Sequence, residues 1–133
     1  MLATRFPVSR WLFGLVLIAL MSAPVAAAEC EPSQDPSPPS DEATGIVFYN
    51  ETQFAMRVFW SGFDGFLEPY SDWIQPGERA GYDTYVGHAW FVELNTYDGP
   101  VCGGPISAYG PDTCQMRILY EGGIGYDAGF CDF

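Results

Sequence analysis

Lysine is missing from this 133-residue sequence, and arginine is scarce, since five arginines stand against 17 acidic residues. Arg5 and Arg10 lie near the N-terminus, so residues 29–133 hold three arginines and every acidic residue, a net charge of −14. Such a surface repels phosphate groups, which disfavours nucleic acids and anionic membranes as partners. Basic partners and weakly attracted cations stay open.

Motifs typical of metal sites and hydrolases are missing as well. His88 is the only histidine and no C-x-x-C pair occurs, so a zinc site would need all four thiolates in a reducing compartment. No G-x-S-x-G elbow supports a serine nucleophile beside His88 and either Asp83 or Asp98. No spacing singles out a carboxylate pair for glycoside chemistry. We therefore expect no catalysis, no cofactor and no metal.

Long apolar runs are limited to one, Trp11–Met21, and its 11 residues are too few to span a bilayer of about 30 Å. Basic residues precede this run, and Ala26 and Ala28 follow it as the small residues of an A-x-A cleavage site. This arrangement predicts a signal peptide over residues 1–28, cleaved after about Ala28, and a secreted or periplasmic protein without stable membrane insertion. An uncleaved anchor is the alternative.

Helical periodicity is absent after residue 28, and β-type patterns replace it. Residues 29–43 are rich in proline, serine and acid, which is typical of an extended linker. The domain is expected over residues 44–133, all-β, as a β-sandwich, because short alternating runs are separated by glycine and proline. Strands are predicted over 45–50, 54–60, 80–86 and 87–94, a weaker one over 105–110, and a hairpin over 115–130.

Four cysteines in an exported chain favour two disulfides. A two-residue Gly122-Gly123 turn would place Cys114 opposite Cys131, at a pair close enough for a bridge. Cys30 would then pair with Cys102 and tie the N-terminal segment to the domain. Pairing of Cys102 with Cys114 is the alternative.

Aromatic residues make up 17% of the sequence. Phe48, Phe59, Phe91 and Trp90 are expected to fill the core. Seven residues whose rings carry a polar N–H or O–H group lie within 31 residues of sequence, and on neighbouring strands their side chains can meet across a sheet. They are Trp60, Tyr70, Trp73, Tyr82, Tyr85, His88 and Trp90.

The residues around His88 predict a pocket. In an unbroken strand, Thr84, His88 and Trp90 point to the same side. A hydroxyl, an imidazole and an indole then form an apolar floor with two partners for a ligand hydroxyl. Strand spacing alone favours the alternative, in which His88 is a satisfied residue of the core. The Asn50-Glu51-Thr52 sequon matters only in a eukaryotic secretory pathway.

The stretch "VFWSGFDGFLEPYSDWIQPGERAGYDTYVGHAWFVE", with "GIVFYN" before it and "TYDG" after it, resembles the β domain of the von Hippel-Lindau tumour suppressor. The resemblance covers residues 45–99 and rests on the ordered "FDG", "PY", "PG" and "Y-x-GH-x-W". It implies a β-sandwich that binds an extended peptide beside its sheet and inserts 4-hydroxyproline into an aromatic pocket.

By this resemblance, five residues form the ligand pocket: Trp60, Tyr70, Thr84, His88 and Trp90. Thr84 stands where the family has serine, and with His88 it would bond the 4-hydroxyl. Tyr70 would reach the hydroxyproline carbonyl, and the two tryptophans would pack on the pyrrolidine ring. Asp83 and Tyr85 are expected to flank the peptide.

The sequence departs from the family at two places. Asp83 replaces a histidine that contacts the peptide backbone, which puts the flanking contacts in doubt. No counterpart of the family's helical domain follows Gly99, so neither elongin nor a ubiquitin ligase is expected as a partner. The sequence predicts a peptide-binding module. The alternative is a structural or surface-interaction β-sandwich without hydroxyproline specificity.

Overall fold

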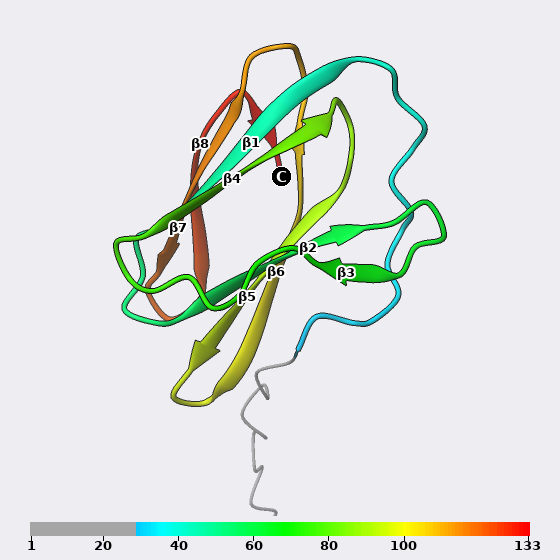
Figure 1. Ribbon diagram of the computed structural model, residues 1–133. Coiled ribbons are helices and arrows are strands. Elements are labelled where there is room, and N and C mark those ends of the chain that lie inside the picture. The colour runs from blue at the N-terminus through cyan, green and yellow to red at the C-terminus, as the bar shows by residue number, and fades with distance from the viewer. Residues whose placement is uncertain (1–28) are drawn as a thin grey trace, which may run out of the picture.

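Two sheets packed face to face make up the protein in a computed structural model that describes residues 29–133 (Figure 1). The predicted signal peptide lies outside these residues. One sheet has the order β4-β1-β7-β8 and the other the order β3-β2-β5-β6-β9. The predicted all-β sandwich is confirmed. No helix in residues 29–133 is long and apolar enough to cross a membrane.

The four-stranded sheet consists of β1 (Ala43–Asn50), β4 (Arg79–Tyr85), β7 (Cys114–Tyr120) and β8 (Ile124–Gly129). The five-stranded sheet consists of β2 (Met56–Ser61), β3 (Leu67–Pro69), β5 (Trp90–Thr96), β6 (Gly99–Ala108) and β9 (Cys131–Asp132). Neighbouring strands pair antiparallel, except that β1 and β7 run parallel. The weak strand predicted over 105–110 is the end of β6, the longest strand.

Alternation along the strands places the core between the sheets. Ile46 and Phe48 of β1 and Met56 and Val58 of β2 point inward and are fully buried, because residues two apart share one face of a strand. Other strands of the two sheets complete this hydrophobic core with Trp90, Val92, Leu94, Ile106, Met116 and Ile118.

Phe59 was expected in the core but lies on the outer face of the five-stranded sheet. It has the parity of Arg57 and not of Met56 and Val58, and its register partner is Phe91. The Arg57 guanidinium lies 5.1 Å from the centroid of the Phe59 ring. Phe91 is buried on this outer face, outside the central cluster.

The segment 30–42, here called the N-terminal strap, packs against the domain. It passes the β2–β3 hairpin before it enters β1 (Figure 1), and Gln34 N–H donates to Gly65 O at 2.7 Å. Ser37 is 3% exposed; its hydroxyl donates to Ser61 O and accepts from Ala89 N–H at 2.9 Å. Composition predicts a linker over residues 29–43, whereas the structure packs this segment against the domain.

Both predicted disulfides are present, Cys30–Cys102 and Cys114–Cys131. The predicted hairpin exists as β7 and β8, but its register differs by one, since Tyr120 pairs with Ile124 around a three-residue loop. Phe130 has a φ of 61°, which ends β8 and redirects the chain. Cys131 then pairs with Ala108 of β6, and this shift still brings it to Cys114.

The strand expected over 87–94 begins at Trp90, because a turn separates β4 from β5. Gly87 has a φ of 83°, a conformation that glycine adopts without steric cost. Its N–H donates to Ala108 O at 3.0 Å, and His88 N–H donates to Tyr85 O at 3.1 Å. His88 therefore lies on a turn and not within a strand.

Asn50 forms a buried hub at the end of β1 and is 0% exposed. Its amide donates to Phe54 O at 2.8 Å and to Ile74 O at 2.9 Å, while its oxygen accepts from the N–H and hydroxyl of Thr52. The amide nitrogen of the sequon is thus fully engaged inside the fold.

Candidate functional site

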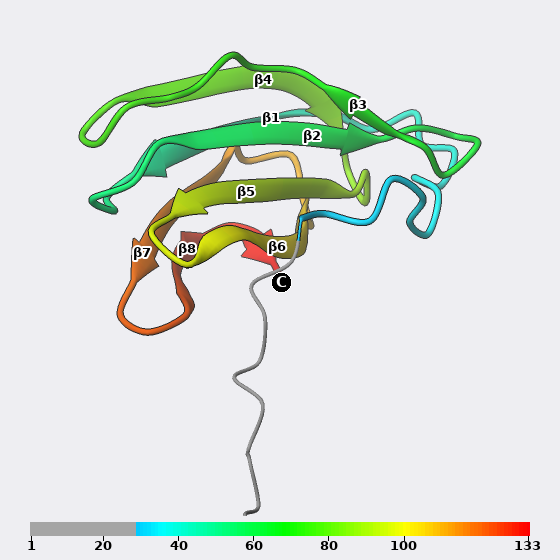
Figure 2. The ribbon, with the colours of Figure 1, turned by 90° about the horizontal axis from the view of Figure 1, so that it is seen from below.

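A pocket of about 200 Å³ lies at the side of the sandwich where the edge strands β4 and β3 come together. Figure 2 shows both strands on this side, and the rings of Tyr82 and Tyr70 meet there at 5.7 Å. Every residue predicted for the ligand pocket and its flanks lines it, together with Phe63: Trp60, Phe63, Tyr70, Asp83, Thr84, Tyr85, His88 and Trp90.

Trp90 forms the floor and is 2% exposed. Its indole N–H donates to the Thr84 hydroxyl oxygen at 3.0 Å. Tyr82 stacks on the indole with ring centroids 5.3 Å apart, and Tyr70 meets it edge-on at 5.0 Å. This bond uses one of the two lone pairs of the Thr84 oxygen, so the hydroxyl can still donate its proton to a ligand.

Trp60 forms a wall of the pocket, next to Trp90 in the sheet. It is the register partner of Trp90 across the β2–β5 pair, so the two side chains lie on the same face. Its ring meets Tyr70 edge-on at 6.1 Å and Phe63 edge-on at 5.3 Å. The pocket is therefore walled by aromatic rings from three different segments.

His88 lies at the inner end of the pocket and is 5% exposed. Three aromatic rings surround it, with centroids 5.6 Å away for Trp60 and 5.5 Å for both Phe63 and Tyr85. Its Nε2 atom is buried and has no hydrogen-bond partner among residues 29–133. Buried polar atoms are nearly always paired, so this nitrogen marks a position where a ligand donor fits.

The N-terminal strap lies close to the imidazole. Burial lowers the pKa of His88 below the ordinary value of 6.5, and the Pro38 backbone partly opposes this shift. A neutral imidazole has one nitrogen that donates a hydrogen bond and one that accepts. In the tautomer that carries its proton on Nδ1, the unpartnered Nε2 is the acceptor.

The mouth of the pocket is aromatic and acidic. Phe63, Tyr70 and Tyr85 are 63%, 46% and 43% exposed. The sequence did not predict Phe63 as a pocket residue, because "FDGF" indicates only a turn. The structure has a turn there, in which Gly62 N–H donates to Phe66 O. An aromatic residue at the tip of a turn facing the predicted pocket was the signal that could have found it.

A second, apolar hollow of about 660 Å³ lies beside the first and is lined by Pro36, Ser37, Pro38, Pro39, Ser40 and Phe63. Phe63 lines both hollows. An extended ligand that leaves the His88 pocket over Phe63 therefore meets a further apolar surface formed by the strap.

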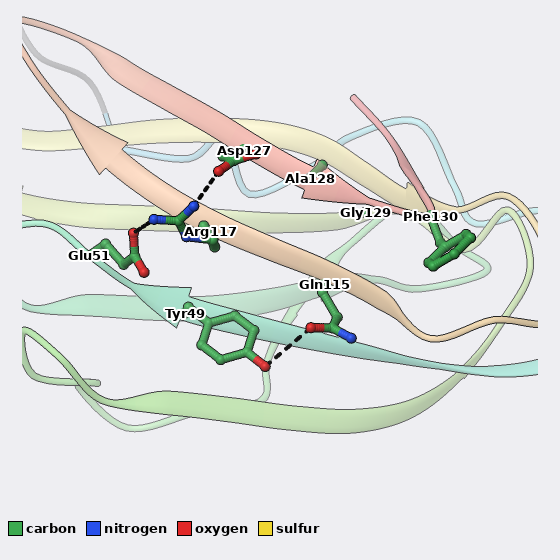
Figure 3. Close-up of a pocket in the computed structure, with 8 residues that line it drawn as sticks. All are labelled: Tyr49, Glu51, Gln115, Arg117, Asp127, Ala128, Gly129 and Phe130. Carbon is green, nitrogen blue, oxygen red and sulfur yellow. Dashed lines mark hydrogen bonds and ion pairs between the residues drawn. The ribbon is translucent and has the colours of Figure 1, made fainter.

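A third hollow, of about 370 Å³, lies on the outer face of the four-stranded sheet and contrasts with the His88 pocket (Figure 3). Arg117 is paired with Glu51 and Asp127, and Tyr49 donates to Gln115. Its polar side chains satisfy one another, whereas the His88 pocket holds an unpartnered nitrogen. The His88 pocket is thus the better candidate for ligand binding.

The family model of the VHL beta domain matches residues 36–102, half of the chain and all of the pocket. The chain belongs to the VHL β domain family. The VHL β domain is in general a protein-binding module that recognises substrates and is not catalytic. Here the match includes part of the strap, and β7, β8 and β9 complete the sandwich beyond it.

An NMR structure of a protein from Eubacterium rectale has a TM-score of 0.44 and 19% sequence identity, and the alignment covers 68% of this chain and 89% of that one. No curated protein matches the chain significantly.

Proposed function

We propose that this VHL β domain is an exported binding module that receives a hydroxyproline of an extended peptide in the His88 pocket. The observation that carries the proposal is the buried, unpartnered Nε2 of His88, a residue that is 5% exposed, in the same pocket as the Thr84 hydroxyl, which accepts from the Trp90 indole. A ligand hydroxyl would donate to Nε2 and accept from Thr84. One hydroxyl then satisfies both groups.

Shape and chemistry of the remaining wall agree with a pyrrolidine ring. Trp60 and Trp90 offer apolar faces in a pocket of about 200 Å³, the scale of one small ring and its backbone. Tyr70 is half exposed at the mouth, where its hydroxyl can reach the peptide carbonyl. Unmodified proline would leave Nε2 and the Thr84 proton buried and unpaired, so it should bind at least about tenfold more weakly.

The peptide backbone has a place to add beside the pocket. β4 is an edge strand whose only strand partner among residues 29–133 is β1, so within these residues one row of its backbone groups is open to a further strand. Asp83 and Tyr85 lie on this edge and would flank the ligand. Strand addition supplies affinity through main-chain bonds, while the pocket supplies specificity.

A purely structural role for the aromatic cluster is the competing function, and the burial of His88 favours it. An unpaired buried nitrogen costs about 1–3 kcal/mol, however, and a packed core without a ligand would avoid that cost. Catalysis has less support, because no serine or other hydroxyl among residues 29–133 bonds to Nε2.

Two disulfides indicate an oxidising environment outside the cytosol. Together with the leader pattern of residues 1–28, they support export. Mass spectrometry of the protein recovered from culture medium or periplasm should give a chain that starts near Glu29, and recovery only as a full-length chain would contradict cleavage.

The deciding experiment titrates the oxidised protein with a hydroxyproline peptide and its proline twin, followed by tryptophan fluorescence and calorimetry. His88→Ala should abolish the preference for hydroxyproline. Equal affinity of the twins, or an unchanged preference in His88→Ala, would remove the hydroxyproline claim.

Thr84 provides a matched pair of variants. Thr84→Ser keeps the hydroxyl and should keep the preference, whereas Thr84→Val keeps the shape and should lose it. Tyr97→Ala, at a side chain that is 91% exposed and outside the pocket, is the control and should bind as the parent does. A Thr84→Val protein that still prefers hydroxyproline would exclude Thr84 from recognition.

A further inference from the structure

The charges around the His88 pocket have one sign. Asp83 lines the pocket and is exposed. Glu68 of β3 is the register partner of Trp60, so its side chain lies on the side of the sheet that carries the pocket wall. Asp64 stands in the turn that presents Phe63, and its carboxylate accepts from Phe66 N–H.

No arginine among residues 29–133 balances these carboxylates. Arg57 pairs with Glu93 on the outer face of the five-stranded sheet, and Arg117 pairs with Glu51 and Asp127 on the other sheet (Figure 3). Arg79 lies 5.9 Å from the centroid of the Tyr49 ring, at the start of β4 and six residues before Tyr85. Within the described chain, neither Asp83 nor Glu68 forms an ion pair.

The unpartnered nitrogen of His88 and the unbalanced carboxylates therefore lie at the same pocket. The unpartnered, buried Nε2 of His88 marks where a ligand enters. The carboxylate in the pocket lining, Asp83, and those of Glu68 and Asp64 on the neighbouring hairpin make its surroundings anionic, on a domain whose net charge is −14 over residues 29–133. Complementary charge raises the association rate and excludes partners of like charge.

We propose that the ligand is a cationic peptide that carries lysine or arginine within a few residues of its hydroxyproline. This inference rests on the proposed function for the position of the ligand, but its charge preference is measured separately. The basic side chains lie against Asp83 and Glu68, while the hydroxyproline ring occupies the pocket. Aspartate or glutamate at the same ligand positions faces repulsion from the same carboxylates.

The test uses three hydroxyproline peptides of equal length whose flanking residues are lysine, glutamine or glutamate, each with a proline twin. We expect the lysine peptide to bind roughly fivefold to tenfold more tightly than the glutamine peptide, and the glutamate peptide to bind most weakly. The differences should shrink in about 1 M salt, where the screening length falls from about 10 Å to about 3 Å.

Two variants locate the effect. Asp83→Asn and Glu68→Gln should each reduce the advantage of the lysine peptide by about two- to threefold and leave the ratio of hydroxyproline to proline affinity unchanged. Asp98→Asn removes the same charge in the β5–β6 turn, away from the pocket, and should change neither quantity.

The two proposals fail in different ways. Equal affinities for the three hydroxyproline peptides, or tightest binding of the glutamate peptide, would overturn the cationic ligand. An advantage of lysine that Asp98→Asn reduces as much as Asp83→Asn does would overturn its location. Equal affinity of every hydroxyproline peptide and its proline twin would overturn the hydroxyproline specificity of the proposed function, while a lysine advantage shared by the twins would keep the cationic ligand.

Discussion

At the scale of the residue, His88 belongs to the pocket lining and carries a buried, unpartnered nitrogen. Burial favours the neutral imidazole, in which one ring nitrogen accepts a hydrogen bond. The Trp90 indole N–H uses one lone pair of the Thr84 hydroxyl, so the hydroxyl proton can be donated to a ligand.

Ligand affinity should depend on pH through His88. Burial lowers the pKa of His88 below 6.5, so affinity should be constant above pH 6.5 and fall about tenfold per unit below that pKa, as Nε2 gains a proton and ceases to accept. Titrations between pH 8 and pH 5 measure this. Asp83, Tyr70 and Tyr85 line the same pocket, so Asp83→Asn must keep the acid decline, and His88→Gln must lose it.

The same shift affects folding. The unfolded chain binds the His88 proton more readily than the folded one, so this contribution to stability is complete above pH 6.5 and is lost as pH falls through the lower pKa of the folded state. Thermal unfolding of parent and His88→Gln over this range should show a steeper decline for the parent. Identical slopes would contradict the assigned shift.

Asn50 is a residue whose loss should lower stability without touching the pocket. Asn50→Ala leaves the Thr52 N–H without its acceptor and removes one of two donors from each of the Phe54 and Ile74 carbonyls, so the free energy of unfolding should fall by about 2–4 kcal/mol. Denaturant unfolding measures this. Asn95→Ala, at an exposed position of β5, is the control and should change it by no more than about 0.5 kcal/mol.

The residues of the pocket were predictable, although one reason for expecting them was wrong. Thr84, His88 and Trp90 were expected to converge by strand parity, but a turn at Gly87 interrupts the strand. They converge because that turn folds His88 back beside Trp60. The resemblance to the VHL family predicted which residues come together in the pocket, and the periodicity of the sequence alone could not predict this. Phe63 escaped both because turn residues show no period.

At the scale of the element, the N-terminal strap is the feature that composition concealed. Proline and serine lower the propensity for strands and helices, so the segment reads as a linker, yet Cys30 and Ser37 each bond to the body of the domain. Individual hydrogen bonds of small polar residues leave no pattern in a sequence. The disulfide partner of Cys30 was the only sequence signal that the segment returns to the domain.

Removing the strap disulfide should weaken binding as well as stability. Cys30→Ser with Cys102→Ser opens a loop of 72 residues, which should cost about 4 kcal/mol of unfolding free energy, and it also loosens Pro38 from His88. The hydroxyproline affinity should fall at a temperature where the variant remains folded. Circular dichroism and titration measure the two effects.

The second disulfide is the matched control. Cys114→Ser with Cys131→Ser opens a loop of 17 residues at a disulfide outside the strap and outside the pocket lining, which should lower stability by about 3 kcal/mol and leave the affinity unchanged. Equal affinity losses in both double variants would show that the strap has no particular role in binding.

At the scale of the whole molecule, the unbalanced charge acts against the compact state. A net charge of −14 on residues 29–133 repels itself, and the surface pairs of Arg117 offset little of this. Raising the salt concentration from about 10 mM to about 300 mM should therefore raise Tm by a few degrees. Scanning calorimetry measures this, and a fall in Tm would show that ion pairs dominate.

The fold class was accessible from sequence because alternation and turn residues are local signals, whereas the register was not. Gly122 and Gly123 predicted a two-residue turn, but the loop contains three residues. The one-residue shift is absorbed by Phe130, whose positive φ no sequence rule assigns to phenylalanine. The predicted cysteine pairing was nevertheless correct, because a disulfide can form over a range of Cα–Cα distances, and a one-residue change of register keeps the two cysteines within that range.

The Cys30–Cys102 bond also determines how the domain bears mechanical load. Tension applied at Cys30 crosses the sulfur–sulfur bond directly to β6, an inner strand of the five-stranded sheet. Residues 31–42 lie in a closed covalent loop and carry none of that tension. Pulling on this end of the domain, as a tether to a surface would, therefore cannot peel the strap from His88 while the disulfide is intact.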